Sequence, residues 1–449
     1  MQSFALALPL IAALGVAWAW FGRHKAGFDS FFAANRTIGF WAAVIAFPVC
    51  WTWANTFIIG PQKAYESGFA AVLWFAALNC VGLFVFAVCA WQMNRVADPS
   101  VPTLTGYIRE RFGGDMVWVY TIVILGTSVY AVVGQLIGAL VLLNYATGFS
   151  KVALIIGLAP MMLLIAYPRG VESSFAADMV KAFMIVIVLG VIAFVMEAAG
   201  KDVFVHTIQG IAQKPVDIWD PKLLRMFVLP LAISWIAGGA LDHQLYQRSR
   251  SLAPSAKSAP WYGILPFGVV VLFISSVGFF APWDVMQGLD HQLAGFVAIQ
   301  HWFPVMGQVF IITVAAALLA TGASALNASA STWAVDIVRP LKPGWSPLSV
   351  SRVAMALILI LSVGLALSGV TLIQLVLFIG SFRGALLFPT LLGLFTKRRL
   401  EPSRLFALSI AMAMCTGPAV AYFTGDNLWG GVTALVLSAV ACVFEWRRR

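Results

Sequence analysis

The chain has 449 residues, of which 61% are hydrophobic and 10% are charged. A soluble globular protein carries about 25% charged residues, so this composition excludes a soluble enzyme, a disordered regulator and a disulfide scaffold. The 28 Lys and Arg residues outnumber the 18 Asp and Glu residues by a net charge of +10, and the first question about such an excess is which side of a membrane it occupies.

About thirteen stretches of the sequence are apolar enough to cross a membrane as α-helices, each of which needs about 20 mostly apolar residues. In chain order they cover residues 3–21, 38–60, 68–92, 115–146, 150–167, 175–198, 225–247, 260–281, 303–337, 350–369, 371–395, 402–422 and 428–446. The first lacks the basic start and cleavage site of a signal peptide, so we expect it to be retained. The predicted fold class is an all-α polytopic membrane protein.

The basic residues divide unequally between the two sides of these spans. If the loop after the first span is cytoplasmic, most of the 28 Lys and Arg residues lie in the cytoplasm. Four of the six that fall on the outer side lie in or beside the long outer loop 199–224, and in long loops basic residues have the least influence on orientation. We therefore expect a bacterial-type inner (plasma) membrane protein with its N-terminus outside and the tail Arg447–Arg449 inside. The net charge then gives no reason to expect nucleic acid as a partner.

The second span contains a predicted interruption. Pro48 removes a backbone donor in mid-span and frees carbonyl groups near it, and the polar residues Thr52, Asn55 and Thr56 follow. Inside a membrane, an irregular backbone is tolerated only where it packs in protein or lines a watery cavity.

The sixth span carries two ionisable residues, Asp178 and Lys181. Ionisable residues within spans are functional hypotheses by default. The two residues stand three apart on one helix face and could pair with each other, so either a structural pair or an ion path is possible.

The seventh span contains the second predicted interruption. It carries Pro230, Gly238 and Gly239, followed by the polar run Asp242-His243-Gln244, in which Asp242 is another ion-path or structural charge. A simple kink would explain either interruption alone. Two interrupted spans lying five spans apart predict an inverted-repeat transporter with its binding site at the membrane midplane.

The ninth span is rich in small hydroxyl residues. Two interpretations stay open, close helix packing with hydroxyl hydrogen bonds or an oxygen cage for a hard cation such as sodium. The residues concerned are Thr321, Ser324, Asn327, Ser329, Ser331 and Thr332.

The eleventh span carries Arg383, which has no local partner. Its side chain could extend toward the inner surface or meet a carboxylate from another span.

The sequence lacks the common signatures of catalysis and cofactor binding. The five cysteines lie in apolar spans without paired spacing, which favours packing over disulfides or metal. There is no H-E-x-x-H, C-x-x-C or phosphate-loop motif. We therefore expect no catalytic residues, no enzyme activity and no organic cofactor.

Several separated motifs share an order and spacing with those of a known family. They are Phe31 to Gly39, Tyr65 to Gly68, Thr103 to Gly113, Phe175 to Asp178, and Leu326 to Ile337. Together they resemble the sodium:solute symporters, which include sugar, proline, pantothenate and urea carriers, over roughly residues 28–400. Within the family, Trp51 to Ala54 and Asp242 to Arg248 resemble the urea-transporter branch, from which Asn55 and Gln247 depart.

The resemblance implies a LeuT-like core of two inverted five-helix repeats that works by alternating access. The expected divisions are an accessory span and loop (1–37), a first repeat (38–198), an outer loop (199–224), a second repeat (225–395), and two accessory spans with a basic tail (396–449).

The resemblance also implies a sodium site. It assigns three backbone carbonyl ligands, at Val49, Thr52 and Ala317, and a pair of hydroxyl ligands at positions 320 and 321. Position 320 is an alanine, Ala320, so only Thr321 supplies a hydroxyl group. Water could complete the site, or coupling could have moved to protons or been lost. Asp178 matches an acidic residue near the inner sodium exit of the family.

We therefore predict a secondary active transporter, with sodium as coupling ion, for a small polar solute such as a urea-like or amino-acid-like molecule. Its partners would be the solute, sodium and the lipid bilayer. The residues expected to bind the solute, through flat walls and hydrogen bonds, are Trp51, Trp53, Asn55, Thr56, Trp74, Asn79, Gln135 and Gln244. The alternatives are a membrane-embedded solute sensor, an uncoupled or proton-coupled carrier of the same fold, and a passive channel, which the paired interruptions disfavour.

Overall fold

The computed structural model describes residues 28–98, 101, 103–167, 170–198, 200, 205, 217–396 and 403–447. Within these ranges the chain forms helices and a single isolated β-bridge between Ile38 and Leu252. The main helices are α2 (Phe28–Ala33), α3 (Phe40–Trp51), α4 (Ala54–Val96), α5 (Leu104–Phe112), α6 (Gly114–Thr147), α7 (Lys151–Ala166), α8 (Val171–Ala198), α11 (Leu229–Leu241), α12 (His243–Arg250), α14 (Ile264–Ser276), α16 (Ala294–Trp302), α17 (Pro304–Thr332), α19 (Pro347–Ala366), α20 (Leu372–Phe395), α21 (Arg404–Thr424) and α22 (Asn427–Arg447).

Every predicted span from residue 38 onward has a helical counterpart, whereas predicted span 3–21 lies outside the described residues. Ten helical segments in the described part are long and apolar enough to cross a membrane. Their outer faces expose large apolar side chains such as Leu265, Ile360 and Phe444, as expected for contact with lipid. The short helices α5 and α16 were not predicted, because neither is long enough to span a bilayer.

Both predicted interruptions are confirmed. Helix α3 ends at Trp51, the backbone is extended at Trp53, and α4 begins at Ala54. Likewise, α11 ends at Leu241, Asp242 is extended, and α12 begins at His243. The Gln135 Oε1 atom accepts a 3.0 Å hydrogen bond from the Ala54 amide, and the Asp242 carboxylate accepts one of 3.0 Å from the Leu245 amide. Side chains therefore satisfy backbone groups that the breaks leave without helical partners.

The end of the second predicted span and the whole of the third form one helical element, α4, with a sharp kink. Within α4, Gly68 has φ 75° and ψ −159°, a backbone conformation that glycine adopts without a Cβ penalty. The predicted boundary at residue 68 therefore falls on the kink.

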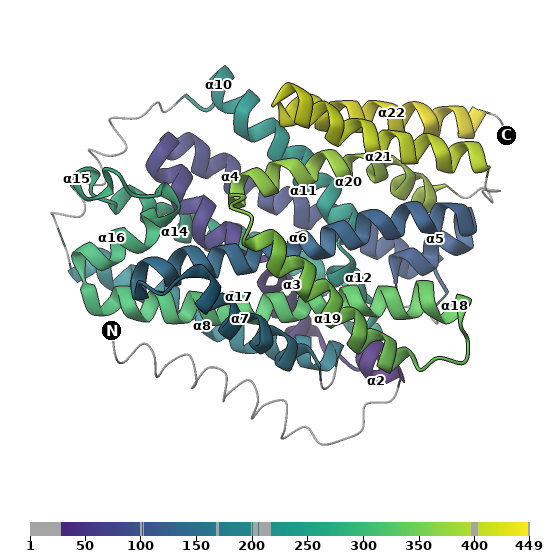
Figure 1. Ribbon diagram of the computed structural model, residues 1–449, viewed down its shortest axis with the longest axis horizontal. Coiled ribbons are helices and arrows are strands. Elements are labelled where there is room, and N and C mark those ends of the chain that lie inside the picture. Colours follow the sequence, from purple (N-terminus) through teal and green to yellow (C-terminus); the bar gives the residue numbers. More distant parts are fainter. Residues whose placement is uncertain are drawn as a thin grey trace.

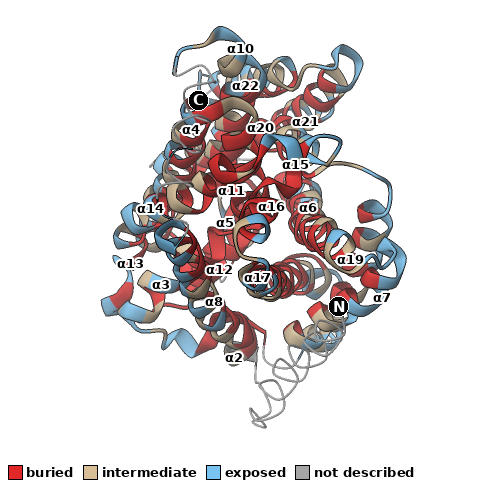
Figure 2. Cartoon of the chain, turned by 90° about the vertical axis from the view of Figure 1, so that its left-hand side faces the viewer, coloured by how far each residue is buried: buried red, intermediate tan, exposed pale blue. Residues whose placement is uncertain are grey.

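The helices form one bundle around the two breaks (Figure 1). Helix α17 packs against α6 and α8, α11 packs against α4 and α20, and α21 and α22 pack together on the outer side of α20. In Figure 2, which looks along the helices, buried residues lie on the faces that the helices turn toward one another. The membrane span that contains α17 is the most buried of the ten candidate spans.

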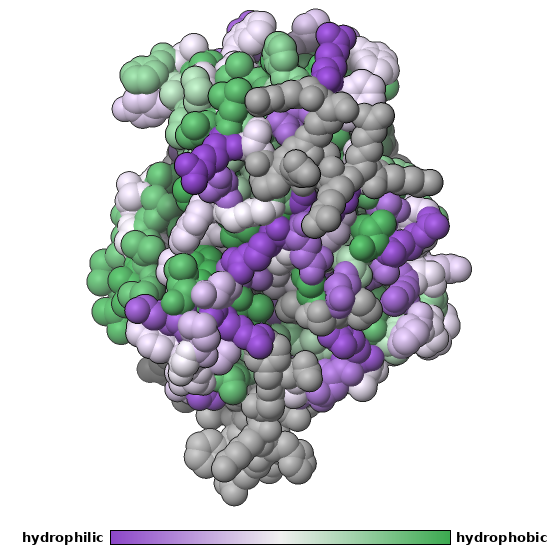
Figure 3. Space-filling view, turned by 90° about the vertical axis from the view of Figure 1, so that its right-hand side faces the viewer, coloured by the Kyte–Doolittle hydropathy of each residue, from purple (hydrophilic) through white to green (hydrophobic). Residues whose placement is uncertain are grey.

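One end of the bundle is strongly hydrophilic. Figure 3 shows polar residues gathered over the end at which α5 and α18 (Arg339–Leu341) lie. The exposed residues of α18 and of the segments near it include Arg339, Lys342 and Arg447. All three are among the basic residues predicted to lie on the cytoplasmic side.

The contact between α11 and α4 depends on the absence of side chains. A Cβ atom on Gly239 would lie 2.1 Å from the Gly82 carbonyl oxygen, a backbone atom that cannot rotate away. We expect Gly239→Ala to lower the free energy of unfolding by about 1–3 kcal/mol through overpacking, measured as a reduced melting temperature in detergent. Gly190→Ala is the control, because a Cβ there would meet nothing within 4 Å. Equal stability of the two variants would contradict this packing.

Candidate functional site

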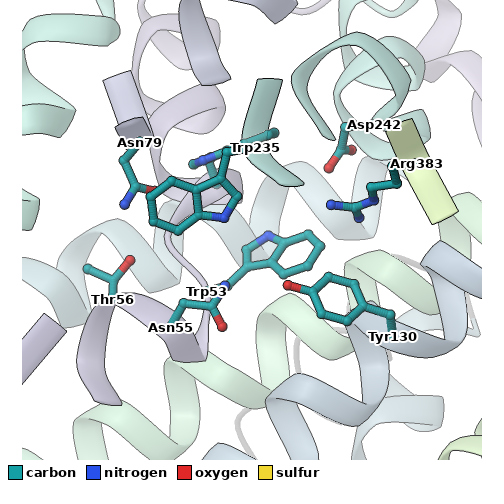
Figure 4. A pocket seen from close by; sticks show the side chains of 9 residues that line it. Trp53, Asn55, Thr56, Asn79, Tyr130, Trp235, Asp242 and Arg383 are labelled. Atoms are coloured by element: carbon teal, nitrogen blue, oxygen red, sulfur yellow. The ribbon is translucent and has the colours of Figure 1, made fainter. Parts of the chain in front are cut away.

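A small, mostly buried cavity lies where the two broken helices meet (Figure 4). Its volume is about 20 Å³, on the order of the space that one water molecule occupies. The lining side chains come from α3, α4, α6, α11 and α20 and from the two breaks. They are Trp51, Trp53, Asn55, Thr56, Asn79, Tyr130, Trp235, Asp242 and Arg383.

Five of the eight residues predicted to bind the solute line this cavity, namely Trp51, Trp53, Asn55, Thr56 and Asn79.

The structure places the other three elsewhere. Trp74 donates its indole N–H to the Ile218 carbonyl 2.8 Å away, Gln135 supports the start of α4, and Gln244 lies beside the Cys50 thiol. The Trp74 indole and the Oε1 atoms of the two glutamines thus have protein partners, whereas the Nε2 atoms of Gln135 and Gln244 make no hydrogen bond among the described residues.

The lining also contains residues that were not predicted to bind the solute. Tyr130 and Trp235 were missed, because an aromatic residue in an apolar span carries no sequence signal that separates lining from packing. Asp242 and Arg383 were singled out as charges but not as lining residues. Their charge within a span was the signal that could have placed them in the cavity, since charged residues in spans usually face a cavity or the bundle interior.

Arg383 faces the cavity and does not extend toward the inner surface. It is buried, its Nε donates to the Thr127 hydroxyl at 3.2 Å, and its guanidinium lies 5.0 Å from the centroid of the Tyr130 ring. Asp242, from another span, lies near it in Figure 4. A Cβ on Gly238 would come within 2.8 Å of Arg383 Nη1, so glycine there leaves room for the guanidinium.

Two polar groups in the cavity lack partners. Among the described residues, neither the Thr56 hydroxyl nor Arg383 Nη2 makes a hydrogen bond. Leaving a buried donor unpaired costs about 1–3 kcal/mol. A bound molecule with hydrogen-bonding groups would recover that free energy.

The oxygen atoms that the family resemblance assigned to a sodium ion contact a protein side chain, that of Lys181. The Lys181 ammonium donates to the Val49 carbonyl at 2.7 Å, to the Thr321 hydroxyl at 2.5 Å and to the Thr52 carbonyl. The Thr321 hydroxyl donates in turn to the Ala317 carbonyl at 2.9 Å. Ala320 contributes only a methyl group. These residues therefore do not fit a sodium ion in the arrangement that the structure shows.

Asp178 pairs with Arg248 and not with Lys181. The Arg248 Nε donates to Asp178 Oδ2 at 2.8 Å, and both side chains are 1% exposed. The alternative of a local Asp178–Lys181 pair was wrong, because Arg248 approaches from α12 while Lys181 is directed at the break after α3.

The hydroxyls of the ninth span mostly join helices. Ser329 lies 3.2 Å from the His243 ring, Ser331 accepts from Gln247 at 3.1 Å, and Asn327 donates to Ser174 at 3.4 Å. These contacts fit the packing interpretation, and only Thr321 contacts the predicted cation ligands.

Comparison with known proteins gives one family and several relatives. The sodium:solute symporter family model matches residues 31–410. Probable urea active transporter 1 of Schizosaccharomyces pombe is 24% identical over 196 residues, which are 43% of this chain and 29% of that protein. The urea-proton symporter DUR3 of rice (Oryza sativa subsp. japonica) is 25% identical over 146 residues, covering 32% of this chain and 20% of that protein. The matches thus span less than a third of either relative.

Solved structures share the fold. A Na⁺-coupled sialic acid symporter in a substrate-bound outward-open state aligns with a TM-score of 0.72 at 16% identity, over 98% of this chain and 97% of that one. The nucleobase-cation-symport-1 family transporter Mhp1 in a closed conformation aligns with a TM-score of 0.59 at 13% identity, over 95% and 96%. These likenesses confirm the all-α, LeuT-like architecture.

The names of the relatives describe transporters and not enzymes, in agreement with the prediction from the motifs. Because the family model covers most of its length, the chain belongs to the sodium:solute symporter family.

Proposed function

We propose that this chain is a secondary active transporter that carries a small polar solute by alternating access through the cavity between the two helix breaks. The observation that carries the proposal is the cavity itself. It places a carboxylate, a guanidinium and an unpaired hydroxyl, from Asp242, Arg383 and Thr56, deep inside an apolar bundle. Polar groups at the junction of two discontinuous helices are typical of a transporter's binding site.

The lining favours a small solute without net charge. Asp242 and Arg383 balance each other in formal charge, so a neutral or zwitterionic molecule leaves no excess charge in the cavity. Trp53, Tyr130 and Trp235 provide flat aromatic walls. At about 20 Å³ the cavity holds about one water molecule, so even a solute as small as urea requires the lining side chains to move apart. A urea-like solute could donate N–H groups to Asp242 and accept from Arg383 through its carbonyl oxygen.

We further propose the orientation that the basic residues predict. The end of the bundle that carries α5 and α18 would face the cytoplasm, together with the C-terminus. The membrane would be the inner (plasma) membrane of a bacterium.

The experiment is a thermal-stability screen of the purified protein with urea, small amides and neutral amino acids, followed by uptake of the stabilising solute into proteoliposomes. A ligand that binds only the folded state raises the free energy of unfolding by an amount that grows with the ratio of its free concentration to its Kd. Stabilisation with saturable uptake supports the transporter. Stabilisation without uptake supports the sensor and contradicts this proposal.

One matched pair of variants tests the cavity. Trp53 lines it and donates its indole N–H to the Cys50 carbonyl at 2.8 Å, whereas Trp74 lies outside it. We expect Trp53→Phe to raise the solute Kd by about tenfold, the equivalent of about 1.4 kcal/mol, because both ring shape and the local hydrogen bond change. Trp74→Phe should leave it unchanged. If Trp74→Phe weakens binding as much as Trp53→Phe, the cavity is not the binding site.

A further inference from the structure

Lys181 presents a fixed positive charge to the break between α3 and α4. Its side chain leaves α8 fully buried, at 0% exposure. A lysine ammonium has three N–H donors and no acceptor, and here each donor has a partner, the Val49 carbonyl, the Thr52 carbonyl and the Thr321 hydroxyl. The contacts therefore join α8, the end of α3 and α17 through a single charged atom.

The electrostatic setting of the break explains why a cation lies there. The last carbonyl groups of a helix lack intrahelical partners and carry a partial negative charge. Val49 and Thr52 lie at the end of α3, and their carbonyl groups point at Lys181. The ammonium thus pairs the Thr52 carbonyl and gives a second donor to the Val49 carbonyl, which also accepts from the Thr52 amide at 3.1 Å.

Among the described residues, no carboxylate near Lys181 is free to balance a second cation. The charged and titratable groups around Lys181 are Asp178 on α8, Arg248 on α12 and Cys50 on α3. Asp178 and Arg248 neutralise each other in their 2.8 Å pair. Helix α17, which supplies Thr321, carries no ionisable residue. A sodium ion beside Lys181 would add a second positive charge within a few ångströms, where the repulsion is large.

The ligand set agrees with this electrostatic argument. Hard cations such as Ca²⁺ need several oxygen ligands, and sodium shares this preference. The three oxygen atoms that would be nearest to it are hydrogen-bonded to Lys181. The Ala317 carbonyl accepts from Thr321, and the Ala320 side chain has no oxygen.

We propose that Lys181 is a tethered cation that replaces the bound sodium of the family, so that this chain binds its solute without sodium. The lysine would join the broken helix to α8 and α17 in the same place as a metal ion, but it cannot leave. The sodium gradient would then supply no driving force through this position. The statement about solute binding rests on the proposed function, whereas the statement about sodium binding does not.

Two measurements on the wild-type protein test the proposal separately. Binding of ²²Na⁺ to purified protein should not exceed that of a protein-free control. The solute Kd should be the same in sodium, potassium and choline chloride at equal ionic strength. Specific ²²Na⁺ binding, or a solute Kd about tenfold lower in sodium than in potassium, would overturn the proposal. If no solute binds under any condition, the proposed function fails, but the ²²Na⁺ result still decides this inference.

A gain-of-function variant tests the role of the lysine. Lys181→Ala with Ala320→Ser removes the tethered charge and adds the missing hydroxyl. We expect sodium, and not potassium, to raise the melting temperature of this double variant. Lys151→Ala, at an exposed lysine at the start of α7, should stay insensitive to both ions. A folded double variant that ignores sodium would count against the proposal, and if it does not fold, the wild-type measurements decide.

Discussion

Replacing Arg383 by methionine is expected to abolish measurable solute binding or to weaken it by about tenfold or more. A hydrogen bond to a charged group contributes about 1.5–3 kcal/mol, and Arg383 offers an unpaired nitrogen in the cavity. Methionine keeps much of the side-chain length but donates no hydrogen bond, and it leaves Asp242 without its opposite charge. The measurement is the solute Kd from thermal-shift titration of the purified variant.

Two controls make this result interpretable. Arg383→Lys retains the charge and should bind better than Arg383→Met but worse than wild type, because lysine lacks the planar fork of donors. Arg404→Met removes an exposed arginine at the start of α21 and should bind as wild type does. A normal Kd in folded Arg383→Met would exclude the guanidinium from solute binding.

Breaking the Asp178–Arg248 pair is expected to have the largest effect on stability. Asp178→Asn leaves the Arg248 charge in a site where both side chains are 1% exposed. Removing one partner of a buried pair costs about 3–5 kcal/mol, because the remaining charge is uncompensated. We expect a large fall in melting temperature, or failure to purify as a monodisperse protein in detergent.

The exposed pair Arg225–Asp426 provides the matched comparison. Its N–O distance is 3.0 Å, but the Arg225 side chain is 62% exposed, and such pairs contribute about 0–1 kcal/mol. Asp426→Asn should therefore be nearly neutral. The double variant Asp178→Asn/Arg248→Met should be more stable than Asp178→Asn alone, since it removes both charges. If Asp178→Asn is as mild as Asp426→Asn, the buried pair does not have the assigned role.

The spans and the breaks could be predicted because they depend on local chemistry. A run of about twenty apolar residues is expected to fold as a membrane-spanning helix and as little else. Pro48, and the glycines that precede Asp242, disturb backbone hydrogen bonding wherever the helix is placed. The clustering of polar residues after each interruption likewise indicated that the freed backbone groups face a cavity or protein.

The contacts of the buried charges could not be predicted, because they depend on which helix faces meet. Spacing along α8 indicates that Asp178 and Lys181 share a face, but it does not reveal that Arg248 approaches one and the carbonyls of α3 the other. The sequence likewise does not reveal where the Arg383 guanidinium points, because that depends on the space that Gly238 leaves on the neighbouring helix. Trp53 lies at the predicted interruption, whereas Trp74 lies in an uninterrupted apolar stretch of α4, and the sequence does not reveal which side of that stretch turns toward the cavity.

Solute counterflow tests the central claim, a binding site that is exposed alternately to the two sides of the membrane. Proteoliposomes are loaded with a high concentration of unlabelled solute and diluted into labelled solute without any ion gradient. We predict a transient accumulation of label above its equilibrium level, lost in Arg383→Met and kept in Arg404→Met. Because no ion gradient is applied, the result does not depend on which ion is coupled. Entry of label only up to equilibrium, as through a channel, or no entry of a solute that binds, would contradict the account.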